Sequence, residues 1–126
     1  MSYLNKPVAY LTNDDFDADG NIVNSQIPKD QPVLIMIQGN FCGYCTQAKP
    51  AFQKLAEKHV GKIFCATIQG DGKEKGESDL AKRLNSVLPG FRGFPEYVMY
   101  KNGKRVKKHE GGRTMEELES FVLSNS

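Results

Sequence analysis

Two cysteines separated by two residues, Cys42 and Cys45, lie where a predicted strand gives way to a predicted helix. The apolar run over residues 33–37 is typical of a strand buried on both faces, and a Gly-Asn pair ends it. Cys42 then lies at the N-terminus of a helix, where unpaired backbone N–H groups and the helix dipole favour a thiolate. The helix is predicted over residues 43–59, because residues suited to one face recur at steps of three and four: Cys45, Ala48, Phe52, Leu55 and His59.

The cysteine count limits the roles that this pair can have. The chain has 126 residues and three cysteines, an odd number, so the disulfide framework of a small secreted protein is not expected. Residues 1–12 contain no long apolar run after a basic start, so we expect no signal peptide, and no stretch approaches the roughly 20 apolar residues of a membrane span. We therefore expect a cytoplasmic protein. In that reducing compartment a close cysteine pair is more often catalytic or metal-binding than structural.

Size and charge indicate one compact domain over residues 1–126, long enough to bury a core without disulfides. Hydrophobic residues make up 39% and charged residues 25%, which is ordinary globular usage. The formal net charge of +2 is too small to indicate binding to nucleic acid or to a membrane surface, so neither partner is expected.

The remaining sequence alternates between strand and helix patterns. Asn102-Gly103 is a strong hairpin signal, Thr114 with Glu117 forms a capping box, and Pro50 should kink its helix. We expect strands over residues 8–11, 33–37, 62–68, 97–100 and 106–109, helices around Phe16 and over residues 43–59, 80–88 and 115–122, and loops over residues 19–30 and 70–78. This order predicts an α/β fold with a mixed sheet of four to five strands. The parallel units come first, the antiparallel hairpin comes last, and helices flank both faces.

Together with the cysteine pair, this order resembles the thioredoxin superfamily over about residues 9–123. Six local matches carry the resemblance. They are Leu11–Asp17 as the first strand-to-helix turn, Cys42-Gly43-Tyr44-Cys45 as the active-site motif, Pro50 as the helix-kinking proline, Arg92-Gly93-Phe94-Pro95 as the cis-proline loop, Lys101-Asn102-Gly103-Lys104 as the hairpin, and Gly111-Gly112 before the last helix.

The resemblance implies thiol–disulfide exchange on protein substrates, with Cys42 attacking and Cys45 resolving the mixed disulfide. It implies a monomer without metal or prosthetic group, recycled by a flavin-dependent reductase or by glutathione. Pro95 would lie against the cysteine pair and leave backbone groups near Phe94 free to bind an extended substrate chain. The remaining implied residues are Phe41, Gly43 and Tyr44 in support of the cysteine pair, and Gly93 and Gly111, with Phe94, in substrate binding.

The sequence also departs from the thioredoxin pattern at four positions. Phe41 replaces the Trp before the first cysteine, and Tyr44 replaces the Pro before the second, as in glutaredoxins. Met36 stands where thioredoxins have a buried Asp, and Thr67 replaces its Lys partner. Since Met cannot accept a proton, water or a polar neighbour of the cysteine pair would have to serve in the resolving step.

Two other functions remain open from the sequence. The first is a glutaredoxin-like, glutathione-dependent oxidoreductase, favoured by Tyr44 and Gly111-Gly112, although Arg113 and Thr114 follow where glutaredoxins usually have an Asp pair. The second is a non-catalytic binding module whose cysteine pair is a structural disulfide or half of a zinc site. Zinc normally takes four ligands, and the other candidates are scattered, so we expect no metal. They are Cys65, His59 and His109.

Two further groups of residues are interpreted as structural. Cys65 lies in an apolar strand pattern and is expected to pack in the core. The basic residues around the hairpin are expected to form a solvated edge that discourages strand pairing, with a docking surface for an acidic partner as the alternative. They are Lys101, Lys104, Arg105, Lys107, Lys108 and Arg113.

Overall fold

The computed structural model describes residues 3–126, which form one five-stranded sheet with the strand order β1-β3-β2-β4-β5. β1, β3 and β2 run parallel, β4 is antiparallel to β2, and β5 is antiparallel to β4. The predicted mixed sheet is therefore confirmed. The strands are β1 (Ala9–Tyr10), β2 (Val33–Gln38), β3 (Phe64–Gln69), β4 (Glu96–Lys101) and β5 (Lys104–Lys108).

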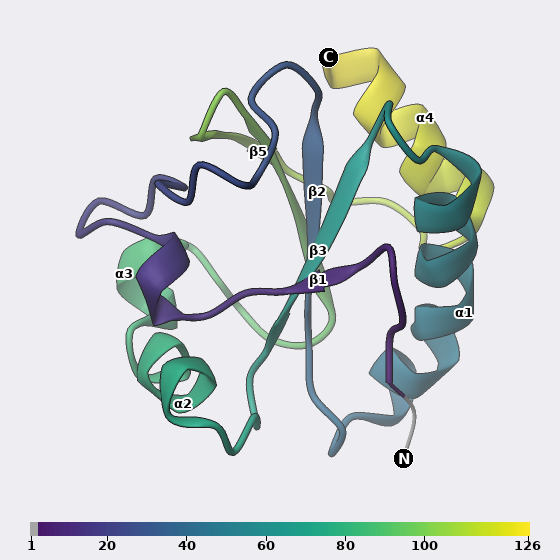
Figure 1. The fold of residues 1–126 in the computed structure, drawn as a ribbon. Helices are drawn as coiled ribbons and strands as arrows, with labels where there is room; N and C mark the ends of the chain where they lie inside the picture. Colours follow the sequence, from purple (N-terminus) through teal and green to yellow (C-terminus); the bar gives the residue numbers. More distant parts are fainter. Residues whose placement is uncertain (1–2) are drawn as a thin grey trace.

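Helices cover both faces of the sheet, as Figure 1 shows. α1 (Gly43–Lys58) and α4 (Met115–Asn125) pack together on one face. α2 (Lys75–Lys82), α3 (Leu84–Val87) and the short 3-10 helix η1 (Asn13–Asp15) lie on the other. α1 begins directly after the loop that leaves β2. The cysteine pair therefore lies beyond the C-terminal end of the central strand.

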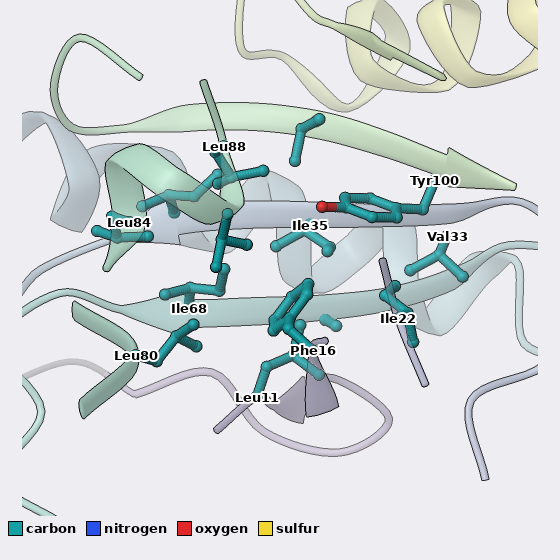
Figure 2. Close-up of a cluster of buried hydrophobic side chains, with 14 of the residues drawn as sticks. Leu11, Phe16, Ile22, Val33, Ile35, Ile68, Leu80, Leu84, Leu88 and Tyr100 are labelled. Carbon is teal, nitrogen blue, oxygen red and sulfur yellow. The ribbon is translucent and has the colours of Figure 1, made fainter. Parts of the chain in front are cut away.

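Alternate side chains of β2 pack in two separate cores, one on each face of the sheet. This confirms the predicted strand buried on both faces. Val33, Ile35 and Ile37 belong to the core under α2 and α3, which Figure 2 shows with Tyr100 and Phe16 beside Ile35. Leu34 and Met36 belong to the core under α1 and α4. Burial of apolar side chains on both faces makes β2 a rigid base for the loop that follows it.

The predicted helix over residues 80–88 is wrong in its bounds. It begins earlier, at Lys75, and is interrupted at Arg83, so residues 75–78 are helical and not loop. The first turn of α2 was missed because residues 75–79 are polar or glycine and give no apolar periodicity. The other differences are small: β3 begins at Phe64, and β5 begins at Lys104.

The Asn102-Gly103 hairpin is confirmed. Asn102 has φ 53° and Gly103 has φ 78°, the two positive values that a tight two-residue turn between strands requires. The cap of the last helix is confirmed as well, because the Thr114 hydroxyl accepts a hydrogen bond from the Glu117 backbone N–H at 3.1 Å. Cys65 is buried at 2% exposure, in agreement with its predicted place in the core.

Arg83 explains the interruption between α2 and α3. Its guanidinium group donates to the backbone carbonyls of Asp17, Asn13 and Phe16 at 2.9, 3.1 and 3.0 Å, and to the Asn13 side chain. These bonds attach the segment around η1 to the junction of α2 and α3. These partners are distant in the sequence, so local helical propensity does not describe the position of Arg83.

We expect Arg83→Met to lower the free energy of unfolding by about 2–3 kcal/mol, because charged donors to partly buried carbonyls are lost and the carbonyls are left unpaired. Chemical denaturation with circular dichroism measures the change. Lys82→Met, at the exposed neighbouring position, is the matched control and should change stability by less than about 0.5 kcal/mol. Equal losses in the two variants would contradict this role for Arg83.

Candidate functional site

Cys42 caps the N-terminus of α1 in an extended conformation, with φ −102° and ψ 113°. Its sulfur accepts a hydrogen bond from the Cys45 backbone N–H at 3.1 Å. The side chain is partly exposed, so a partner molecule can reach the sulfur. The sulfur therefore has a backbone donor aimed at it and lies at a helix N-terminus, which is the position that the sequence predicted.

Cys45 lies one turn inside α1 and is fully buried, at 0% exposure. Burial raises the pKa of the Cys45 thiol above its ordinary value, and the hydrogen bond with Cys42 is the second cause of the increase. All three cysteines are free thiols. The pair is therefore asymmetric: one sulfur faces outward with a helix N-terminus behind it, and the other is protected and neutral.

Pro95 belongs to a loop that reaches Cys42. It is buried, it follows a cis Phe94–Pro95 peptide bond, and it immediately precedes β4. The Cys42 sulfur lies 3.7 Å from the Phe94 carbonyl oxygen, although the two residues are 52 positions apart. The fold thus brings the cysteine loop and the Phe94-Pro95 loop together at the C-terminal end of β2.

An aromatic surface surrounds Cys42. Phe41 is 65% exposed and its ring packs edge-on against Phe94, with the ring centroids 5.1 Å apart. Phe91 also packs edge-on against Phe94, at the same centroid distance of 5.1 Å. Sequence reasoning missed Phe91, although its place three residues before Phe94 could have suggested it. Exposed aromatic rings grouped at one site are typical of a surface that binds a partner.

The other predicted supporting and binding residues lie near the same end of the sheet. Tyr44 is 67% exposed, and the Arg113 guanidinium lies 5.8 Å from the centre of its ring. Gly43 is exposed in the first turn of α1, and Gly93 is half-buried just before Phe94. Gly111 lines a hollow of about 180 Å³ that also contains Pro95 and Arg113.

The two histidines are structural, as expected. His59 caps the end of α1 and pairs with Glu119 of α4 at 2.5 Å. His109 contacts the Gly112 carbonyl oxygen at 2.7 Å through its Nε2, and its ring packs on Phe121. Neither lies in the cysteine loop.

Asp71 holds the loop that carries Cys42. Its carboxylate accepts hydrogen bonds from the backbone N–H groups of Asn40 and Phe41 at 3.0 and 3.3 Å, and from the Gln69 side chain at 3.1 Å. Burial alone would raise the pKa of Asp71, but these hydrogen bonds outweigh it and lower the pKa. The sequence placed this residue in a charged loop without assigning it a role, because its partners are about 30 positions away.

Lys49 is a further residue that sequence reasoning missed. It is a lysine at only 3% exposure, and its amine donates to the Asn40 side-chain oxygen at 3.0 Å. Burial lowers the pKa of this ammonium group. The signal was available: position 49 falls on the apolar face of the predicted helix, four residues after Cys45, yet carries a lysine.

The strand beneath the helix has no carboxylate at the position where thioredoxins have one. Met36 is fully buried, and the Thr67 hydroxyl donates to its carbonyl oxygen at 2.7 Å. The Gln38 amide donates to that same hydroxyl at 3.3 Å, while its own oxygen is buried without a hydrogen bond.

Within residues 3–126, no cluster of three or more His, Cys, Asp or Glu side chains is arranged to hold a metal ion. No helix of that same part of the chain has the length and apolar character needed to cross a bilayer.

Comparison with known proteins agrees with this geometry. The family model for thioredoxin matches residues 7–124. A protein described as thioredoxin-like, 453L of Invertebrate iridescent virus 6, is 41% identical over 135 residues, covering 98% of this chain and 97% of that protein. Thioredoxin of Alicyclobacillus acidocaldarius subsp. acidocaldarius is 28% identical over 94 residues, covering 75% of this chain and 81% of that protein.

A third relative is longer than this chain. Thioredoxin M5, chloroplastic, of Oryza sativa subsp. japonica is 27% identical over 93 residues, covering 74% of this chain and 49% of that protein. The family model spans all five strands and both cysteines, and the viral relative matches almost end to end. The chain therefore belongs to the thioredoxin family.

Proposed function

We propose that this protein is a thiol–disulfide oxidoreductase that acts on protein disulfides through Cys42 and Cys45. The observation that carries the proposal is the asymmetry of the pair. Cys42 is partly exposed at the N-cap of α1, and Cys45 is fully buried one turn further on. A structural disulfide would not require one sulfur to face solvent beside exposed aromatic rings.

The exchange proceeds in two balanced steps. The Cys42 thiolate attacks one sulfur of a substrate disulfide, forming a Cys42–substrate S–S bond and releasing the other substrate sulfur as a thiolate. Cys45 then loses its proton to solvent and attacks the Cys42 sulfur. The Cys42–Cys45 bond forms, and the electron pair leaves with the second substrate sulfur. The substrate gains two electrons, and the cysteine pair is oxidised.

The surroundings of Cys42 suit an extended polypeptide substrate. Phe41 and Tyr44 offer exposed rings, and Phe94 places its backbone carbonyl beside the attacking sulfur. Main-chain groups at Gly93 and Phe94, in the loop before β4, can pair with an extended chain in the manner of an added strand. Gly111 would contribute to the same surface through the hollow next to Pro95.

One observation favours a glutathione-dependent variant of this chemistry as the second candidate. The hollow next to Pro95 is lined by Gly111 and by the charged residues Arg92, Lys108, Arg113, Glu96 and Glu110, of which three are basic. Guanidinium groups suit the carboxylates of a small tripeptide thiol.

Reduction of insulin by the purified protein tests the proposal. Reduction should be faster than with dithiothreitol alone, and the protein should contain no stoichiometric zinc. A parallel assay compares recycling by a flavin-dependent reductase with recycling by glutathione, and this separates the two candidates. A monomer working in the reducing cytoplasm is part of the proposal. An inactive protein with stoichiometric zinc would instead identify a metal-binding module.

A further inference from the structure

Lys49 is a buried lysine close to the cysteine loop. A lysine normally extends its ammonium group into water, and fully buried lysines are rare unless paired. Here the side chain is 3% exposed and its amine donates to Asn40, which lies two residues before Cys42. The charge is therefore held inside the protein, next to the loop that carries the reactive sulfur.

The geometry of α1 brings this charge over the resolving cysteine. Residues four apart on a helix lie on one face, and a helical side chain covers the turn that precedes its own Cα. Cys45 is in that preceding turn. The bond to Asn40 confirms that the lysine side chain extends toward the N-terminus of α1, since Asn40 stands before the first turn.

The attacking form of Cys45 is a buried thiolate, which is costly without a compensating charge. Met36 offers no charge from the strand below. Lys49 and Cys45 act on each other in the expected directions: the ammonium lowers the pKa of the thiol, and the thiol raises the pKa of the amine, in each case against a larger opposite effect of burial.

We propose that Lys49 is a positioning residue for the resolving step: its buried ammonium group, held by Asn40 above the first turn of α1, stabilises the Cys45 thiolate while that sulfur attacks Cys42. The inference rests on the proposed thiol–disulfide exchange. Lys49 takes no proton in this scheme. The proton of Cys45 leaves to solvent, and the positive charge favours its departure.

Several other ionisable groups lie near the Lys49 ammonium group or the Asn40 side chain. Cys42 and Asp71 act on Lys49 through their charges, and both favour its protonated form. Burial raises the pKa of the Tyr97 phenol in β4, and the charge of Cys45 raises it further, so Tyr97 stays neutral at physiological pH. A hollow of about 430 Å³ beside Asn40 carries further groups, namely Tyr3, Tyr10, Lys73, Glu74 and Glu77. Burial raises the pKa values of Tyr10 and Glu77.

The test isolates the resolving step with the aromatic disulfide dithiobis(nitrobenzoate). Cys42 attacks it and releases one coloured thiolate, and Cys45 then displaces the second from Cys42. The rate of the second release should fall about three- to tenfold in Lys49→Met at neutral pH. Each unit of increase in the pKa of Cys45 lowers the fraction of Cys45 present as thiolate tenfold. The more basic thiolate is about threefold more nucleophilic, which offsets part of this loss.

Three comparisons distinguish charge from packing. Lys49→Arg should retain most of the wild-type rate because it keeps the charge. Lys49→Gln can still donate to Asn40, but should be as slow as Lys49→Met. The ratio of wild-type to Lys49→Met rates should fall toward one at alkaline pH, as Lys49 itself loses its proton. Lys54→Met, at an exposed position of the same helix, is the matched control and should resolve at the wild-type rate.

The outcome that overturns the inference is a second-phase rate in Lys49→Gln or Lys49→Met equal to that of the wild type. A pH-independent ratio would also overturn it, since that would indicate a structural role. Failure of the proposed function is a different result, because a wild-type protein that shows no second release, or does not reduce insulin, has no resolving step to support.

Discussion

Cys42→Ser should abolish disulfide reduction, whereas Cys45→Ser should complete the first step and then stop. A serine hydroxyl cannot replace the thiolate that attacks the substrate, so the rate should fall by at least about 10³-fold in Cys42→Ser. In Cys45→Ser, the partly exposed Cys42 still forms a mixed disulfide. Nothing inside the protein resolves that bond, and the complex should accumulate.

Insulin reduction and mass spectrometry of the trapped complexes measure these outcomes. Only Cys45→Ser should be isolated with one covalently bound substrate chain. Cys65→Ala is the control for a cysteine outside the site, because Cys65 is buried in β3 and burial raises the pKa of its thiol to about 12. It should keep its activity, at some cost in stability. A stable mixed disulfide on Cys45 in the Cys42→Ser variant would contradict the assignment of the two roles.

The asymmetry behind this prediction was readable from the sequence because it is local. A buried strand, a glycine-containing break and a helical repeat place Cys42 at the first turn and Cys45 inside it, without any distant contact. The Asn102-Gly103 turn and the Thr114 cap are local in the same sense, and both were predicted correctly.

Pro95 is a different case. The preceding residue, Phe94, contacts Cys42 across 52 positions, which no periodicity in the sequence reports, and only the family resemblance suggested that this loop lies beside the cysteine pair. Asp71 is similar, since it supports the cysteine loop through backbone N–H groups about 30 positions away. Side chains that bind distant backbone leave no trace in a hydrophobic pattern.

Lys49 and the first turn of α2 were missed for opposite reasons. The lysine interrupts an otherwise apolar helix face, which is a local signal that was overlooked. The start of α2 consists of polar residues and glycine, so it carries no apolar signal to find. Arg83 then sets the boundary between α2 and α3 through long-range hydrogen bonds, which local propensity does not describe.

Met36→Asp should have two opposing effects. Met36 is fully buried in the core under α1, so a carboxyl group there would lower the free energy of unfolding by about 2–4 kcal/mol at neutral pH. The same group would stand below the helix that carries Cys45. As a carboxylate it could accept the Cys45 proton, so the resolving step should become faster.

The two effects depend on pH in a predictable way. Burial would raise the pKa of the introduced acid in the folded protein above its value in the unfolded chain. The variant should therefore be least destabilised below the unfolded pKa, where the acid is neutral in both states, and should lose stability as pH rises from there to the folded pKa. The faster resolution should develop as pH approaches and passes the folded pKa, since only the carboxylate accepts a proton.

Denaturation curves and the second release from dithiobis(nitrobenzoate), both measured across this pH range, test the prediction. Met36→Leu keeps the volume without an acid and should change stability by less than about 1.5 kcal/mol, with no gain in resolution rate. Met36→Asn adds polarity without titrating, so its loss of stability should not vary with pH. If folded Met36→Asp resolves no faster than Met36→Asn at any pH, the absence of a carboxylate at position 36 does not limit the resolving step of this protein.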